Sequence, residues 1–219
     1  LAQGWQVKLL IRDIKKVPKW FSSTQQIKSP TTANNSEQHL WLGDCSVQSD
    51  VEQAAMDVDI IVYAANPVYN QWHKYAFAML EPSIITAEKF GLHILFPGNV
   101  YGYNPHSKQK GGPIENFINS VFQKSSISVF GSGKQKIDYI NIKDIGDCIE
   151  MIIQNTKLSH EVFNVGSGKL NSIEEIAKII SANGKKLCGY STKIKKTPAP
   201  KDKIWPDRLM SIRKIKTRI

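Results

Sequence analysis

The sequence has no long hydrophobic run and few cysteines. Nowhere in its 219 residues do about eighteen apolar residues follow one another, and its start lacks the basic segment of a secretory signal. We therefore expect neither a membrane-spanning helix nor secretion. Cys45, Cys148 and Cys188 lie far apart and lack Cys-x-x-Cys spacing. This pattern favours a cytoplasmic protein with reduced thiols and indicates neither a disulfide nor a metal site.

The histidines and tryptophans also lack the spacing of a binding site. The five histidines are dispersed and have no acidic partners at helical intervals, so a metal site is not predicted. The five tryptophans are equally scattered, and they form no aromatic platform on which nucleic-acid bases could stack.

Positive charge is concentrated at the C-terminal end. The net charge is +10, and residues 184–219 carry twelve Lys or Arg against two acids, whereas residues 1–183 carry seventeen of each. Three interpretations stay open: a solvated terminus, a site for an anionic small ligand, and nonspecific binding of nucleic acid. We expect the anionic ligand ahead of nucleic acid, and we do not predict nucleic acid as a partner.

Apolar runs of strand length alternate with amphipathic stretches of helix length in the N-terminal half. This alternation predicts an α/β fold with a mostly parallel sheet covered by helices. The expected strands are residues 6–11, 39–42, 59–63 and 92–96. We expect one helix that begins with Ser49 as its N-cap. A second helix is expected over residues 71–89, with Gly91 as its stop signal. Strand, helix, strand, helix, strand is half of a doubly wound domain.

The C-terminal half is predicted to form a smaller α/β region. We expect strands at residues 127–130, 137–142 and 161–165. We expect helices over residues 114–122, over residues 144–155 with Asp144 as the cap, and over residues 172–182 with Ser172 as the cap. Ser172 and Glu175 have the spacing of a capping box. We predict two domains: residues 1–102 as a partial dinucleotide-binding domain, and residues 103–219 as a substrate-binding region with a basic tail.

Short motifs follow the predicted strands in a characteristic order. They are Gly43-Asp44, Tyr63-Ala64-Ala65-Asn66, Asn99-Val100-Tyr101-Gly102, Val129 to Gln135 running into Asp138-Tyr139-Ile140, Asp144, and Phe163 to Gly168. In this order they resemble the extended short-chain dehydrogenase/reductase family, the NAD(P)-dependent epimerases and dehydratases of nucleotide sugars. The resemblance implies a Rossmann-like doubly wound parallel sheet, NAD or NADP as cofactor and a nucleotide-sugar-like ligand. It allows a homodimer and implies no membrane partner.

The resemblance also implies cofactor-binding residues at the carboxyl ends of the strands, where such sheets bind ligands. Arg12 ends the second strand of the family's sheet, and a guanidinium there slightly favours the 2′-phosphate of NADP; alternatively, it is a surface charge. Asp44 matches the acceptor for the adenine amino group, or else it caps a turn. Ala64 and Ala65 allow close approach of the dinucleotide, or else pack tightly in the core.

Further positions carried over from the family complete the predicted site. Asn66 and Asn99 are assigned to cofactor binding, and Tyr101 to substrate binding. Lys136 flanks the position at which relatives have a diphosphate-binding Arg, and Lys lacks its bidentate fork. Arg208 resembles a second diphosphate contact, with a solvated charge as the alternative.

Several catalytic features of the family are absent from the sequence. The glycine-rich turn that holds the pyrophosphate is not present, and we expect that the first strand is missing with it. Pro97 occupies the position of the catalytic Ser or Thr, and the single Tyr-x-x-x-Lys string, Tyr139 to Lys143, falls in a predicted strand. We therefore assign no catalytic residue and expect a truncated, catalytically impaired member of the family. The alternatives are a non-catalytic Rossmann-like binding or regulatory protein and a nucleic-acid binder that uses the basic tail.

Overall fold

The computed structural model describes residues 6–17, 40–68, 71–102, 112–199 and 207–219. The chain divides into two compact units. Unit 1 comprises residues 1–96 and 152–163, and unit 2 comprises residues 97–151 and 164–219. The units thus interleave along the chain, whereas the sequence predicts two consecutive domains; the functional division at residue 102 stays a prediction. His39 and the predicted loop from Tyr103 lie outside the described residues.

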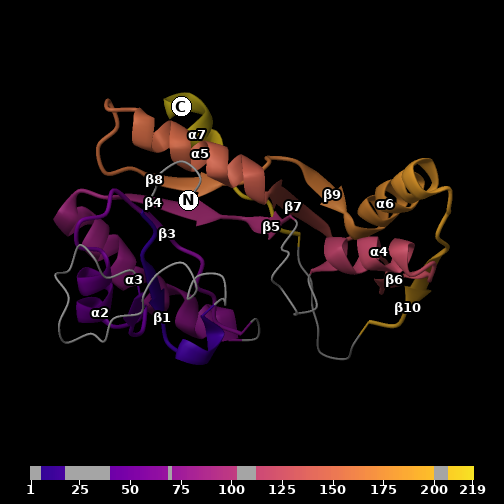
Figure 1. Cartoon of the computed structure of the whole chain (residues 1–219), viewed down its shortest axis with the longest axis horizontal. Helices are drawn as coiled ribbons and strands as arrows, with labels where there is room; N and C mark the ends of the chain where they lie inside the picture. The colour runs from indigo at the N-terminus through magenta and orange to yellow at the C-terminus, as the bar shows by residue number, and fades with distance from the viewer. Residues whose placement is uncertain (1–5, 18–39, 69–70, 103–111, 200–206) are drawn as a thin grey trace. The chain divides into compact units, whose positions relative to one another are not determined.

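Unit 1 contains two parallel strand ladders (Figure 1). Strands β1 (Leu9–Ile11) and β2 (Leu40–Leu42) pair in parallel, with Ile11 opposite Leu42. Strands β3 (Ile60–Val62) and β4 (His93–Pro97) also pair in parallel, and β8 (Val162–Val165) adds to the other side of β4. The α/β class and the Rossmann-like parallel arrangement predicted from the sequence are confirmed.

The helices of unit 1 follow β2 and β3 along the chain, as a doubly wound fold requires. Helix α2 (Gln48–Ala54) packs on β1, β2 and α3 (Trp72–Phe90), and the short 3-10 turn η1 (Ile14–Lys16) follows β1. Buried residues of α3 and β4 meet in one apolar cluster, which includes Ala87 and Ile94. Gly91 ends α3 in the left-handed conformation at φ 69°, which confirms the predicted stop signal.

Unit 2 contains the remaining strands and helices. Strand β7 (Lys136–Asn141) pairs in parallel with β5 (Asn99–Tyr101) and antiparallel with β9 (Leu170–Ser172). Strands β6 (Ile127–Phe130) and β10 (Ile194–Thr197) form a second, parallel pair. The helices are α4 (Pro113–Phe122), α6 (Ile173–Cys188) and α7 (Arg213–Arg218), while α5 (Ile142–Gln154) runs from unit 2 into unit 1.

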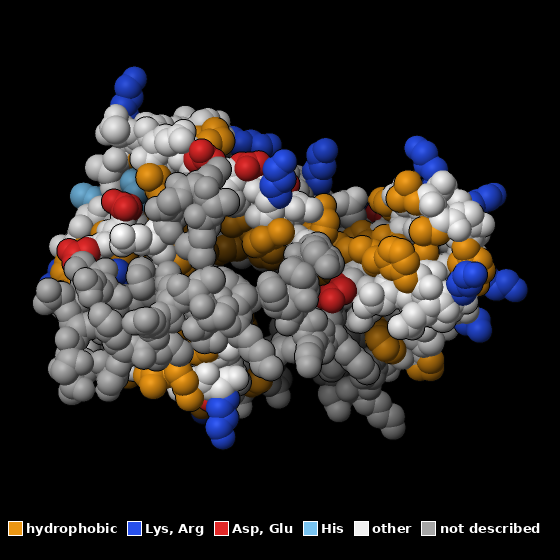
Figure 2. Space-filling view, in the orientation of Figure 1, with side chains coloured by type: hydrophobic (Ala, Val, Ile, Leu, Met, Phe, Trp, Pro, Cys, Tyr) orange, Lys and Arg blue, Asp and Glu red, His pale blue; other side chains and the backbone are white. Residues whose placement is uncertain are grey.

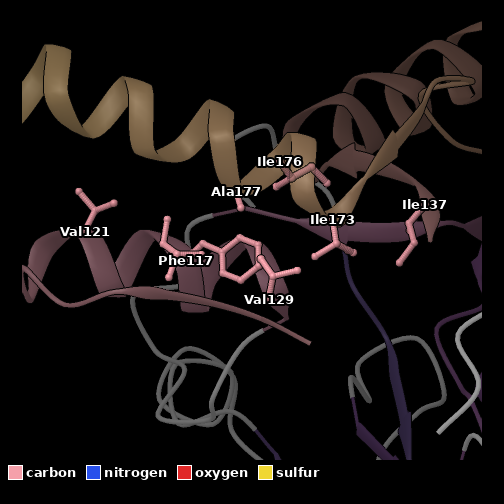
Figure 3. Close-up of a cluster of buried hydrophobic side chains, with 8 residues drawn as sticks. Phe117, Val121, Val129, Ile137, Ile173, Ile176 and Ala177 are labelled. Carbon is pink, nitrogen blue, oxygen red and sulfur yellow. The ribbon is translucent and has the colours of Figure 1, made fainter. Parts of the chain in front are cut away.

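An apolar core between α4, α6 and β6 stabilises unit 2 (Figure 3). Phe117 and Val121 from α4 face Ile176 and Ala177 from α6, and Val129 of β6 is completely buried among them. Burial of such side chains contributes about 1.5–3 kcal/mol each to folding. This core holds α4 and α6 together along their length.

Two predicted helix caps are wrong, and both errors have a local cause. Helix α2 begins one residue before Ser49, with Val47 at the N-cap, because Val47 N–H donates to Asp44 O and starts the first turn earlier. Helix α5 begins at Ile142, and Asn141 Oδ1 accepts from Lys143 N at 2.9 Å. Asn141 is therefore the N-cap in place of Asp144, since Asn and Asp are equally good N-caps.

The capping box of α6 is confirmed, whereas the predicted end of α6 is wrong. Ser172 Oγ accepts from Glu175 N at 3.1 Å, and Glu175 Oε2 accepts from Ser172 N at 2.7 Å. The helix continues past Ala182 to Cys188 and ends at Gly189 in the left-handed conformation. Gly184 is accommodated inside the helix because α4 packs closely against it.

None of the described helices combines the length and the apolar character that crossing a bilayer requires.

Candidate functional site

The carboxyl ends of β1 and β2 bring Arg12 and Asp44 together in unit 1. Gly43 N–H donates to Ile11 O at 3.1 Å, which aligns the two strand ends. Arg12 Nη1 then lies 3.4 Å from Asp44 Oδ2, and the Arg12 side chain is 78% exposed. Such an exposed ion pair contributes little to stability, so its interest lies in the position at the ligand-binding edge of a parallel sheet.

Asp44 is also the acceptor of a tight local turn. Its Oδ1 accepts from Ser46 N at 2.9 Å and from Ser46 Oγ at 2.8 Å. These two hydrogen bonds, followed by the Arg12 guanidinium, lower the pKa of Asp44 below its ordinary value. A carboxylate offers about four acceptor positions, so Ser46 and Arg12 leave one on Oδ2 for a ligand. The turn-capping interpretation of Asp44 is therefore seen directly, and the adenine contact stays a prediction.

Gly43 permits a close approach between this turn and helix α2. Asp50 Oδ2 accepts from Asp44 N at 2.8 Å. A Cβ atom on Gly43 would lie 2.8 Å from the same oxygen, too close for any side chain. The Gly43-Asp44 pair thus fixes the turn on the first turn of α2.

The end of β3 lies within electrostatic range of the end of β2. Burial, together with the charge of a Cys45 thiolate, raises the pKa of Tyr63 to about 12. Burial and the Asp44 charge also raise the pKa of Cys45, while Arg12 lowers it. Tyr63 packs on Phe96 with ring centroids 5.4 Å apart, and its hydroxyl is buried without a hydrogen-bond partner among the described residues. Groups after β1, β2 and β3 are therefore close enough in unit 1 to influence one another electrostatically.

The residues that follow Tyr63 run toward α3. Ala64 is exposed and Ala65 is half-buried, so neither packs in the core as the alternative interpretation requires. Asn66 is exposed, and its Oδ1 accepts from Trp72 Nε1 at 3.1 Å, which connects the segment to the first residue of α3. Their cofactor roles stay predictions.

Three of the remaining predicted residues come together in unit 2. Asn99 Nδ2 donates to Asp138 O at 3.1 Å, and Asn99 Oδ1 lies 3.4 Å from Arg208 Nη1. Lys136 N–H donates to Asp207 Oδ1 at 2.7 Å, and Lys136 O accepts from Arg208 N at 2.9 Å. The chain around Arg208 therefore lies along β7, with Ile137 and Arg208 in a parallel bridge. Asn99 was predicted with the cofactor residues, yet its neighbours are the predicted diphosphate contacts.

A buried carboxylate at the centre of this group was not singled out from the sequence. Asp138 is only 1% exposed, and its carboxylate accepts from Ser167 N at 2.9 Å, from Ser167 Oγ at 2.5 Å and from Gly168 N at 3.1 Å. A Cβ atom on Gly166 would lie 2.7 Å from Asp138 Oδ2. Asp138 thus holds the glycine-containing turn after β8. An acid within an otherwise alternating strand was the signal available in the sequence.

The residues expected at the catalytic positions do not form an acid–base pair. Tyr139 lies in strand β7, as predicted, and pairs with Asn99 of β5. Lys143, which was predicted in the same strand, lies in the first turn of α5. Burial raises the pKa of Tyr139, and the nearby Arg208 lowers it only in part. A tyrosine that accepts a proton near neutral pH needs a lowered pKa instead. Pro97, the last residue of β4, offers no hydroxyl.

Tyr101 completes the predicted set, and metal ligands do not cluster. Tyr101 ends β5 opposite Asn141 and is 37% exposed, so its ring is accessible to a ligand. Within the ranges that the structure describes, no three His, Cys, Asp or Glu side chains are placed to hold a metal ion.

Comparison with known proteins agrees with the fold. Residues 71–166 match the NAD dependent epimerase/dehydratase family. A putative UDP-glucose 4-epimerase of Methanocaldococcus jannaschii is 34% identical over 87 residues, which are 40% of this chain and 28% of that protein. The aligned stretch thus spans less than a third of that relative.

Solved structures resemble a larger part of the chain. UDP-glucose 4-epimerase of Thermotoga maritima with UDP-glucose has a TM-score of 0.60 at 14% identity, covering 99% of this chain and 85% of that one. UDP-glucose 4-epimerase of Thermus thermophilus in complex with NAD has a TM-score of 0.59 at 13% identity, covering 99% and 86%. At this identity the likeness establishes the fold.

Proposed function

Since residues 71–166 match the NAD dependent epimerase/dehydratase family, we propose that the chain is an NAD(P)- and nucleotide-sugar-binding member of that family with impaired turnover. Unit 1 would bind the adenosine part of the dinucleotide, and unit 2 would bind the diphosphate of the sugar nucleotide. The solved relatives include an epimerase complex with NAD and one with UDP-glucose, and both support this proposal.

The Arg12–Asp44 contact carries the cofactor half of the proposal. It places an exposed guanidinium and a carboxylate with one remaining acceptor position at neighbouring strand ends. Asp44 is suited to accept from the adenine amino group, and Arg12 to bind a ribose 2′-phosphate. These residues fit the adenosine portion of NADP.

The group around Arg208 supports diphosphate binding by unit 2. Asn99 contacts the Arg208 guanidinium and would orient it, while the exposed Lys136 side chain adds a second positive charge. Arg recognises phosphate oxygens with two parallel hydrogen bonds, and Lys acts as a point charge. The Asp138 carboxylate accepts from Ser167 N and Gly168 N and so holds the turn after β8 beside this group.

Impaired turnover is proposed from the residues that replace the acid–base machinery. When bound, NAD(P) supplies reversible hydride transfer. A sugar hydroxyl would still need a positioned base to accept its proton, and such bases contribute about 10²–10⁴-fold to rate. Pro97 cannot assist, and the raised pKa of Tyr139 opposes this role. Binding without efficient catalysis follows. A homodimer also stays a proposal, which light scattering of the purified chain would test.

Isothermal titration calorimetry with NADP⁺ and NAD⁺ tests the cofactor site. The Arg12→Ala variant should bind NADP⁺ about tenfold more weakly and NAD⁺ nearly unchanged, since one charge-assisted phosphate contact is lost. Lys15→Ala, a neighbouring exposed charge, is the control and should bind both as the native chain does. Equal losses for both dinucleotides, or binding of neither by the native chain, would contradict the assignment.

Binding and turnover of UDP-glucose separate the two halves of the proposal. Arg208→Lys should weaken UDP-glucose binding, while incubation of the native chain with UDP-glucose and NAD(P)⁺ should yield no epimer by chromatography. Efficient epimer formation would refute impaired turnover and leave the binding assignment intact.

A further inference from the structure

The two most exposed large apolar side chains of the described residues lie at neighbouring helix ends. Leu187 is 79% exposed and Phe122 is 72% exposed. Phe122 is the last residue of α4, and Leu187 is the last but one of α6. Exposure of these two apolar side chains to water does not stabilise the fold. Exposed apolar side chains that lie close together are typical of an interaction site.

The helix ends that carry these side chains are firmly joined. Gly184 of α6 faces Val121, whose Cγ1 atom would lie 2.6 Å from a Cβ at that glycine (Figure 3 shows Val121 on α4). Tyr190 Oη donates to Lys124 O at 2.8 Å, and Ser181 Oγ donates to Thr192 O at 2.7 Å. Phe122 and Leu187 are therefore presented by one rigid surface.

The described segments that form this surface carry several lysines and no acidic side chain. Residues 116–126 and 176–199 contain seven lysines and no Asp or Glu. Glu174 pairs with Lys178 and Lys196, whereas the lysines closest in sequence to the helix ends have no ion-pair partner among the described residues. Together with the two apolar side chains they define the α4–α6 tip: Phe122, Lys124, Lys185, Lys186, Leu187 and Lys193.

We propose that the α4–α6 tip binds the surface of an anionic phospholipid bilayer. Its lysines attract acidic headgroups, and Phe122 and Leu187 enter the interfacial region, where apolar side chains leave water. Figure 2 shows lysine and apolar side chains gathered together over the end of the view where α4 and α6 lie. The lysines alone could bind any polyanion, including nucleic acid. The exposed Phe122 and Leu187 side chains favour a lipid interface, because they can enter it and leave water.

This inference goes beyond the proposed function and does not depend on it. The sequence predicted no membrane partner, because it has no long apolar run. Phe122 and Leu187 lie in different helices, and neither residue alone indicates a lipid-binding surface. The tip emerges only when α4 and α6 pack side by side.

Vesicle co-sedimentation of the full chain tests the proposal. The chain should bind phosphatidylcholine vesicles that contain about a third phosphatidylserine, and bind pure phosphatidylcholine vesicles weakly. Each tip lysine should contribute about fivefold to the partition coefficient, so Lys124→Glu with Lys186→Glu should lower it more than about twentyfold. Phe122→Ser with Leu187→Ser should lower it even at low salt, where lysine attraction is strongest.

Matched changes elsewhere on the chain provide the controls. Lys15→Glu with Lys157→Glu removes the same charge from exposed positions of unit 1, and Phe77→Ser removes a 67% exposed apolar side chain from α3. Both should bind vesicles as the native chain does, and thermal unfolding should confirm that every variant folds. Equal losses in tip and control variants would overturn the proposal. So would native binding to duplex DNA, abolished by the tip lysine changes, without any binding to anionic vesicles.

Discussion

Arg208 and Asn99 lie in side-chain contact, with Arg208 Nη1 3.4 Å from Asn99 Oδ1, although 109 residues separate them in the sequence. The amide of Asn99 also donates to Asp138 O, so one side chain connects β5, β7 and the strand-like segment at Arg208. This contact assembles the candidate diphosphate site of unit 2 from three distant parts of the chain.

Removal of the Asp138 carboxylate should destabilise unit 2 strongly. Asp138→Ala leaves Ser167 N, Ser167 Oγ and Gly168 N without their acceptor in a buried site. Loss of charge-assisted hydrogen bonds there should lower the free energy of unfolding by about 2–4 kcal/mol. Urea denaturation measures the change, and Asp144→Ala, at an exposed acid of α5, should cost far less. Equal effects of the two changes would show that the carboxylate does not hold the turn.

Two helical glycines should respond in opposite directions to the same substitution. Gly184→Ala places a methyl group 2.6 Å from Val121 Cγ1 and should destabilise the chain by about 1–3 kcal/mol through overpacking. Gly146→Ala in α5 meets no atom within 4 Å and should stabilise by about 0.5–1 kcal/mol, because alanine favours the helix. Thermal unfolding of both variants is the measurement. A neutral or stabilising Gly184→Ala would contradict the close packing of α4 against α6.

Stability should fall as the pH is lowered through the range in which histidine titrates. His93 Nδ1 accepts from Glu161 N at 3.1 Å, so the ring is neutral with its proton on Nε2. Burial lowers the pKa of His93 below its ordinary 6.5, and His160 lowers it further, while Glu161 and Asp59 raise it. Below pH 6.5, His93 therefore binds a proton more readily in the unfolded chain than in the folded chain, which favours unfolding.

The resulting loss is at most about 1.4 kcal/mol for each pH unit, and it ends below the pKa of His93 in the folded chain. Urea denaturation between pH 5 and pH 8 (about the range in which histidine titrates) should show this fall in the native chain. His93→Gln should flatten it, whereas His73→Gln, at an exposed position of α3, should not. The account of His93 fails if the two variants keep the same slope.

Local signals in the sequence predicted most of the elements but few of the long-range contacts. Gly91, Ser172 and Glu175 act within one helical turn, so their roles could be recognised from spacing. Strand β10 could not be predicted, because Lys195 and Lys196 make it resemble a solvated tail and only its pairing with β6 stabilises it.

The candidate site shows the same limit. Arg12 and Asp44 were predicted separately from the strand ends, and their contact depends on the pairing of β1 with β2. Asp138 was quoted only as part of a motif, since its three donors come from a turn about thirty residues farther along the chain. Segments distant in sequence meet only through tertiary packing, and spacing carries no information about that.

Hydrogen–deuterium exchange with and without NADP⁺ tests the central claim most directly. If the carboxyl edge of unit 1 binds the adenosine half of the cofactor, backbone amides after β1, β2 and β3 should become protected, namely those of residues 12–17, 43–47 and 63–68, and Arg12→Ala should reduce this protection. Saturating NADP⁺ that protects none of these three segments, or protects only residues of unit 2, would contradict the account.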